Sequence, residues 1–354
     1  MRSQPYHGSP FGLLALEIVE RAAGAAFLYY LPHLLESRVD GAPQAVRLAA
    51  YYGAGTYGLA IVFRLFSVPH AWGLRVGAGL MALGTTVFLW KVRLAIWISC
   101  LLFAAGAAAW KTNLLPSYGE LGGKTGHLHA AIAGGYLMGI PLFGMLVDPV
   151  VLVLSVGATF GLVLAGTCFV AIGESAASEP DNTGGGFGYA LVMFVALVPI
   201  SMLTYVPLLS FSPQAIRLAD SVGWNKGIFG LVMLLASCGA GVLIRTNDRL
   251  LVWAGLLLSL VACWVLAMHP SSVSLVLIAH LLIGVADALL HQFLYPVALR
   301  NKNGTTAYFV TVALGQVLLA ATAAVDPKVM IAALAALGLI GSAVAYRVRP
   351  LLSA

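Results

Sequence analysis

Long apolar stretches follow one another along almost the whole chain. Each ends at charged residues, proline or glycine and has the length of about twenty residues that an α-helix needs to cross a bilayer. The pattern predicts about twelve membrane-spanning helices in two sets of six, with eleven as the alternative because the junctions at 67–70 and 90–93 are short. The first set is expected at residues 11–35, 45–67, 70–90, 93–115, 127–147 and 150–173, and the second at residues 187–209, 221–244, 249–268, 272–297, 306–325 and 328–349.

A polar segment separates the two sets of predicted helices. It contains three consecutive glycines, one proline and few large apolar side chains, a composition typical of a flexible linker. We therefore expect an N-terminal six-helix bundle at residues 1–173, a cytoplasmic linker at residues 174–186 and a C-terminal six-helix bundle at residues 187–354. The predicted fold class is all-α and integral to the membrane.

The composition agrees with this fold class. Of the 354 residues, 60% are hydrophobic and 9% are charged, whereas about 25% are charged in an ordinary soluble domain. Lys and Arg are scattered singly near predicted helix ends and form no basic stripe, which argues against nucleic-acid binding. More of them lie on the cytoplasmic side if both termini do, so we expect a multi-pass protein of the plasma (inner) membrane with that orientation.

The sequence contains no nucleotide-binding loop, no nucleophile elbow and no Cys/His spacing typical of zinc sites. We therefore expect no enzyme active site, no metal and no cofactor. The expected partners are a small-molecule substrate, protons and the lipid bilayer, and the sequence leaves the oligomeric state open.

Three ionisable residues lie near the middle of the first predicted helix. Glu17, Glu20 and Arg21 each cost about 2.5 to 3.5 kcal/mol to insert at the centre of a bilayer. Glu17 and Arg21 have the favourable i, i+4 spacing, which leaves Glu20 to pair with Lys111 on another helix. Because buried ion pairs seldom repay their desolvation, we favour proton coupling by these four residues over a purely structural ion-pair cluster.

A polar stripe follows one face of the helix predicted at residues 272–297. Asp287, His291 and Tyr295 recur at i, i+4 and i+8, and Gln292 lies beside them. A metal site would need a third ligand nearby, whereas an interhelical hydrogen bond, a proton site or a solute site needs none. We expect Asp287, His291 and Gln292 to bind the solute.

Four short segments carry a family resemblance. They are Glu17-Ile-Val-Glu20-Arg21, Tyr52-Gly-Ala-Gly-Thr-Tyr57-Gly, Trp110-Lys111-Thr-Asn113 and Asp287 with the leucines that follow it. In that order they resemble the E-x-x-E-R, Y-G-x-x-x-Y, K-P-N-V and E-x-L-L-S-P segments of the proton-dependent oligopeptide transporters. This family belongs to the major facilitator superfamily, so the resemblance implies two six-helix bundles with the solute bound between them.

The resemblance also implies roles for particular residues. The second tyrosine of the family's segment lines the peptide site, which corresponds to Tyr57, and its lysine pairs with the first-helix glutamates, which corresponds to Lys111. The chain departs from the family where an aromatic run after the first motif is replaced by Ala22-Ala23-Gly24-Ala25. It also lacks an acidic residue at 187–209 and the Asp-Arg pattern after the second helix.

These features together predict a proton-coupled secondary transporter of a small solute that works by alternating access. Tyr57 and Asn113 are expected to bind the solute together with Asp287, His291 and Gln292. Such an acidic, basic and amide lining suits a zwitterion, such as a small peptide or an amino-acid-like metabolite.

Two alternatives come from other functional classes. A non-transporting membrane partner or sensor derived from a transporter fold is favoured by the lost aromatic run. An intramembrane enzyme would use Asp287 and His291, and the sequence offers no third catalytic group for it.

Overall fold

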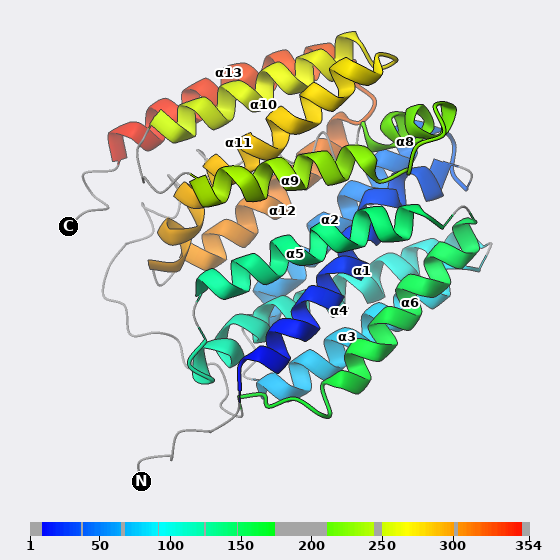
Figure 1. Cartoon of the computed structure of the whole chain (residues 1–354), viewed down its shortest axis with the longest axis vertical. Helices are drawn as coiled ribbons and strands as arrows, with labels where there is room; N and C mark the ends of the chain where they lie inside the picture. Colours follow the sequence, from blue (N-terminus) through cyan, green and yellow to red (C-terminus); the bar gives the residue numbers. More distant parts are fainter. Residues whose placement is uncertain are drawn as a thin grey trace. The chain divides into compact units, whose positions relative to one another are not determined.

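The computed structural model describes residues 9–36, 38–64, 68–90, 92–123, 125–146, 148–173, 211–243, 250–300 and 304–348. This part of the chain forms twelve helices and no strand, as Figure 1 shows. The earlier helices are α1 (Phe11–Glu36), α2 (Ala42–Arg64), α3 (His70–Phe88), α4 (Arg93–Glu120), α5 (Thr125–Gly144) and α6 (Pro149–Gly166). The later ones are α8 (Ser212–Ser221), α9 (Ile228–Leu243), α10 (Leu250–Met268), α11 (Val273–Arg300), α12 (Gly304–Thr322) and α13 (Pro327–Val348).

Each predicted span that falls in the described part of the chain is a helix, and only the boundaries differ. The span predicted at 187–209 and the linker at 174–186 lie outside the described residues. The helix predicted to end at 115 runs on to Glu120 through Pro116. The helix predicted to end at 173 stops at Gly166, where the Thr167 hydroxyl donates to the carbonyl oxygen of Leu164.

The short helix α8 was not predicted. It spans ten residues and contains Pro213, Arg217 and Asp220, so its sequence has neither the length nor the apolar character of a membrane span. Pro213 lies in its first turn, where the missing backbone N–H has no partner to lose.

The chain divides into two compact units. The first contains Met1–Leu28 and Gly55–Glu179, and the second contains Tyr29–Ala54 and Pro180–Ala354. Helices α1 and α2 therefore contribute residues to both units. The predicted bundle boundary at residues 174–186 stays a prediction.

In the first unit, α3 and α4 approach each other at backbone distance. A Cβ atom added to Gly77 would lie 2.8 Å from the carbonyl oxygen of Gly106, and one added to Gly106 would lie 2.6 Å from the carbonyl oxygen of Gly77. Farther along, a Cβ on Gly84 would lie 2.8 Å from the backbone nitrogen of Phe103. Small residues at such positions allow close helix packing in a membrane.

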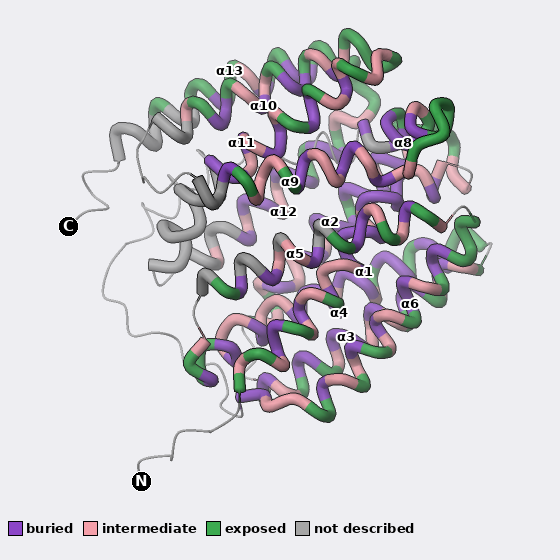
Figure 2. Tube along the Cα trace, in the orientation of Figure 1, coloured by how far each residue is buried: buried purple, intermediate pink, exposed green. Residues whose placement is uncertain are grey.

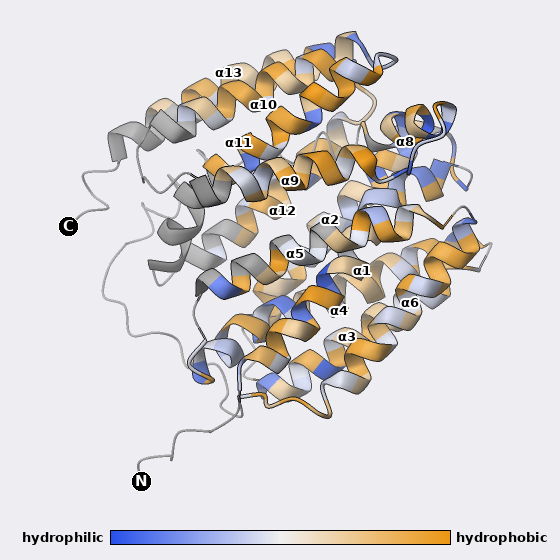
Figure 3. Cartoon of the chain, viewed as in Figure 1, coloured by the Kyte–Doolittle hydropathy of each residue, from blue (hydrophilic) through white to orange (hydrophobic). Residues whose placement is uncertain are grey.

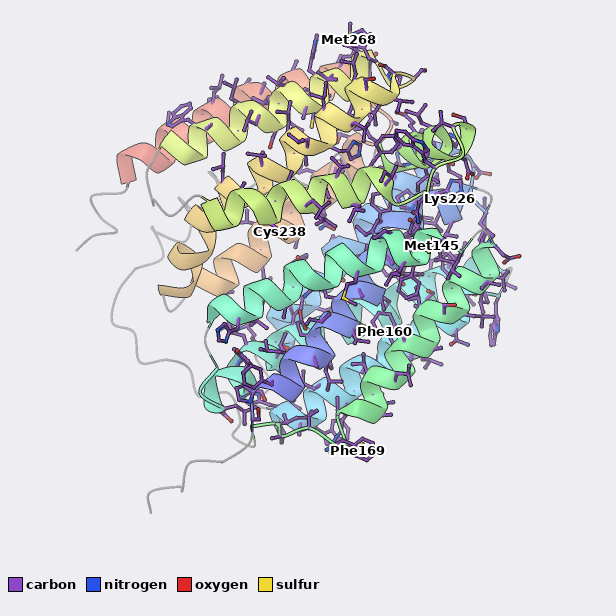
Figure 4. The ribbon with its side chains drawn as sticks, in the orientation of Figure 1. Met145, Phe160, Phe169, Lys226, Cys238 and Met268 are labelled. Atoms are coloured by element: carbon purple, nitrogen blue, oxygen red, sulfur yellow. The ribbon has the colours of Figure 1, made fainter. Side chains whose placement is uncertain are left out.

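Four phenylalanines form the aromatic core of the first unit. Ring centroids lie 5.6 Å apart for Phe27 and Phe88, 5.0 Å for Phe27 and Phe103, and 5.6 Å for Phe103 and Phe160. Figure 4 labels Phe160 among these helices and Phe169 at the edge of the unit, where Phe169 is 89% exposed.

In the second unit, α11 packs against α9 and α10. A Cβ added to Gly284 of α11 would collide with the carbonyl group of Met233 in α9. The start of α2 joins this unit through Arg47, whose Nε donates to the carbonyl oxygen of Ala320 in α12 at 3.3 Å. The end of α1 joins it through Glu36, which pairs with Arg217 of α8 at 2.6 Å.

The helices present apolar side chains outward. Leu94, Trp97 and Leu101 of α4 and Leu154 and Leu162 of α6 are all at least half exposed, and hydrophobic colouring covers much of the helical ribbon in Figure 3. Figure 2 shows exposed residues along these helices as well as at their ends. Within the described chain, Arg93–Glu120 and Pro149–Gly166 are long and apolar enough to cross a membrane, and several other apolar helices are shorter.

Candidate functional site

The three ionisable residues of α1 lie inside the first unit. Glu17 is fully buried and Glu20 is 3% exposed, while the side chain of Arg21 is 14% exposed. Oε1 of Glu17 accepts hydrogen bonds from Nη2 of Arg21 at 3.0 Å and from Nε of Arg21 at 3.3 Å. The i, i+4 pair expected from the sequence is therefore present.

Trp110 of α4 provides a further donor to Glu17. Its indole Nε1 donates to Oε2 of Glu17 at 2.7 Å, so both carboxylate oxygens of Glu17 are hydrogen-bonded. Sequence reasoning missed this residue, although a tryptophan inside a long apolar run needs a partner for its N–H when it is buried. The bond joins α1 to α4 at the residue that precedes Lys111.

Glu20 has a different environment from Glu17. Its Oε2 lies 3.9 Å from Nε of Arg21, and no described residue forms a hydrogen bond to this buried oxygen. The charges of Arg21, Glu17 and Lys111 all act on Glu20. A buried polar atom without a partner is costly, so the two glutamates of α1 differ in how well their oxygens are satisfied.

Lys111 lies over the ring of Tyr57, which belongs to α2. Its Nζ is 4.2 Å from the ring centroid, the geometry of a cation–π contact. The sequence suggested a direct pair with Glu20; the contacts described for Lys111 do not include one, although its charge acts on Glu20. Lys111 and Tyr57, two of the predicted site residues, are thus brought together.

Asn113 is engaged at the interface of α3 and α4. Its Nδ2 donates to the carbonyl oxygen of Ala109 at 2.8 Å, and its Oδ1 lies 3.1 Å from Nδ1 of His70. A Cβ added to Gly73 of α3 would collide with this amide. Any solute that used Asn113 would have to compete with these partners.

The polar stripe of α11 belongs to the second unit. Asp287 is partly buried, and its Oδ2 accepts a hydrogen bond from Oγ of Ser237 in α9 at 3.2 Å. The charge of Asp287 also acts on the thiol of Cys238, which Figure 4 labels on α9. His291 and Gln292 lie on α11, but their side chains are outside the described part of the structure.

Metal binding finds no support among the described side chains. Nowhere among them do three His, Cys, Asp or Glu residues gather closely enough to hold an ion.

Sequence comparison gives no relative for this chain. No family model matches it, and no curated protein matches it by sequence search.

Structure comparison, in contrast, finds solved transporters over almost the full length. An auto-inhibited POT family peptide transporter superposes with a TM-score of 0.80 at 11% identity, covering 96% of each chain. A POT family transporter in complex with 5-aminolevulinic acid gives 0.76 at 11% identity, covering 98% of this chain and 96% of that one. A third POT family transporter gives 0.78 at 10% identity over 99% of each chain.

These similar structures are transporters and not enzymes. The fold implied by the resemblance of the four short segments is confirmed, at 10% to 11% sequence identity. The chain has the fold of the POT family peptide transporters.

Proposed function

We propose that this protein is a secondary transporter that couples movement of a small solute to protons by alternating access. The observation that carries the proposal is the buried acid–base group on α1 and α4, which contains Glu17, Glu20, Arg21 and Lys111. Ionisable groups are costly inside a membrane, and those that persist there commonly mark ion and proton pathways.

The two carboxylates have different proposed roles. Glu17 is held by Arg21 and Trp110, so it anchors the group. Glu20, whose Oε2 has no hydrogen-bond donor among the described residues, takes up and releases the proton. Protonation of Glu20 removes a negative charge that acts on Lys111, which frees Lys111 to settle on Tyr57, and loss of the proton draws it back.

The proposed solute is a zwitterion such as a small peptide or an amino-acid-like metabolite. Similar structures hold 5-aminolevulinic acid and a thioalcohol-conjugated peptide. Tyr57 in the first unit and Asp287 in the second are the solute contacts to examine first. His291 and Gln292 stay proposed contacts, and Asn113 is the weakest candidate because its amide already has partners.

The proposed location is the plasma (inner) membrane, with both termini in the cytoplasm. This orientation follows from the distribution of Lys and Arg. It places the first residue of α3 and the last residue of α4 at the cytoplasmic side.

A two-stage experiment tests the function. Peptides, amino acids and nucleosides are first screened for thermal stabilisation of the purified protein at pH 5.5 and 7.5, since a bound solute raises the apparent stability. The solute that stabilises is then measured for uptake into proteoliposomes with and without an imposed proton gradient.

Variants separate the outcomes of this experiment. We expect Glu20→Gln and Lys111→Ala to abolish gradient-driven accumulation, whereas Lys328→Ala, at an exposed residue of α13, retains it. Accumulation by Glu20→Gln with unchanged pH dependence would disprove the proton role. A well-folded wild-type protein that no solute stabilises would favour the non-transporting alternative.

A further inference from the structure

A second acid–base pair lies in the first unit, away from the group on α1. His70, the first residue of α3, is fully buried, and its Nε2 lies 3.4 Å from Oε1 of Glu120, the last residue of α4. The Glu120 side chain is 30% exposed. No described residue forms a hydrogen bond to Nε2 of His70.

The tautomer of His70 follows from the orientation of Asn113. The Asn113 amide nitrogen donates to the carbonyl oxygen of Ala109 at 2.8 Å and to the Thr112 hydroxyl at 3.3 Å. Because carbonyl oxygens only accept hydrogen bonds, this end of the amide must be the NH2 group. Oδ1 of Asn113 therefore faces Nδ1 of His70 at 3.1 Å, and Nδ1 must carry the ring hydrogen.

A neutral His70 would then present a bare lone pair on Nε2 to the carboxylate of Glu120. Two acceptors at this distance repel each other, and a fully buried nitrogen would have no partner. One proton on Nε2 turns the same contact into an ion pair between opposite charges. We propose that His70 and Glu120 bind one proton between them, as a site separate from Glu17 and Glu20.

Glu120 takes part in a further interaction besides its contact with His70. Arg75 of α3 is the nearest charged residue along the same helix, and its Nη2 lies 3.5 Å from the carbonyl oxygen of Thr167. The chain after α6 brings backbone to this end of the unit, since the Gly173 amide donates to Oγ of Ser117 at 3.0 Å. A Cβ on Gly173 would collide with the Glu120 carboxylate, so no side chain separates this backbone from Glu120.

The proton shared by His70 and Glu120 consequently determines how strongly the start of α3 is held to the end of α4. With the proton bound, an ion pair holds the start of α3 to the end of α4, and Ser117 joins the same turn of α4 to the chain after α6. Without it, the contact between α3 and Glu120 becomes repulsive. If the proposed function and orientation hold, the site responds to the proton concentration of the cytoplasm.

Nitrogen NMR on the intact protein tests the proton site directly. The protein is labelled with 15N-histidine, reconstituted in lipid nanodiscs and measured at pH 7, and the His70 signals are identified by their loss in His70→Gln. The 15N shift separates protonated from bare ring nitrogens, so each nitrogen is read independently. The exposed His127 and His269 serve as internal references.

We expect both ring nitrogens of His70 to carry or share a proton in the wild-type protein. In Glu120→Gln, whose amide can donate to Nε2 without an added proton, Nδ1 should stay protonated and Nε2 should become bare. Asn113→Leu is a second variant. It removes the acceptor that faces Nδ1, so Nδ1 should be bare in a fraction of the molecules.

Either of two results would overturn the proposal. One is a bare Nε2 in the wild-type protein, identical to that of Glu120→Gln. The other is a bare Nδ1 in the wild-type protein, which would refute the tautomer assigned through Asn113. The measurement uses neither solute nor transport, so its failure is distinguishable from a failure of the proposed function.

Discussion

The indole nitrogen of Trp110 lies 2.7 Å from Oε2 of Glu17, which makes a residue of α4 the fixed support of a carboxylate on α1. Arg21 supports the other oxygen of the same carboxylate. Glu17 is thus satisfied by side chains from two helices, whereas Glu20, one turn away, is not. The contrast between the two glutamates underlies their different proposed roles.

Removing the indole donor should weaken the first unit. Trp110→Phe keeps an aromatic ring but loses the hydrogen bond to an ionised group, which is worth about 1.5 to 3 kcal/mol. We expect a lower unfolding temperature in detergent. Trp97→Phe, at a half-exposed tryptophan of the same helix, is the control, and equal shifts in the two variants would show that the bond to Glu17 contributes nothing.

The close approach of α3 and α4 should not tolerate a methyl group. A Cβ on Gly77 would lie 2.8 Å from the carbonyl oxygen of Gly106 and 2.9 Å from the backbone nitrogen of Trp110, so Gly77→Ala should destabilise the unit by about 1 to 3 kcal/mol. At Gly79 the nearest atom is a side-chain carbon of Leu164 at 3.8 Å. Gly79→Ala should therefore be neutral or stabilising in thermal unfolding, and a loss as large as that of Gly77→Ala would contradict the packing described.

The ring face of Tyr57 should matter more to Lys111 than the tyrosine hydroxyl. Tyr57→Phe keeps the cation–π contact and Tyr57→Leu removes it, at a cost of about 0.5 to 2 kcal/mol. We expect Tyr57→Leu to lower the uptake of the solute identified by screening several-fold more than Tyr57→Phe does. The reverse order would mean that the hydroxyl, rather than the ring, serves the site.

In the second unit, the absence of a side chain at Gly53 of α2 should be needed to make room for Gln316 of α12. Gln316 is 1% exposed, and a Cβ on Gly53 would collide with its side-chain amide. Gly53→Ala should therefore lower the unfolding temperature, and Gln316→Ala in the same chain should restore part of the loss, because the pair is coupled.

Gly58→Ala serves as the control for this pair, since nothing lies within 4 Å of a Cβ at that position of α2. Additive effects of Gly53→Ala and Gln316→Ala would refute the coupling.

The sequence predicted those contacts that lie within one helix. The Glu17–Arg21 pair follows from i, i+4 spacing alone, and apolar runs of sufficient length located the helices in the described chain. Contacts between helices, such as the bond from Trp110 to Glu17, needed the structure, because the rotation of α4 about its axis determines which of its side chains meet α1. The pattern of residues along one helix does not determine how that helix is rotated relative to its neighbours.

The proton site at His70 was missed for a more specific reason. The fourth helix was expected to end at residue 115, which assigned Glu120 to a loop. Its continuation through Pro116 carries Glu120 more than one turn farther along the helix axis, to the first residue of α3. A boundary error of five residues thus concealed the partner of a buried histidine.

The contact between Gly77 and Gly106 has a mechanical consequence. Because the backbones of α3 and α4 touch at these glycines with no side chain between them, we expect the two helices to move together. Lys111 and Glu120 both lie on α4, separated by nine residues or roughly 14 Å of helix. A displacement of α4 that carries Lys111 toward or away from Glu20 would therefore also move the His70–Glu120 pair.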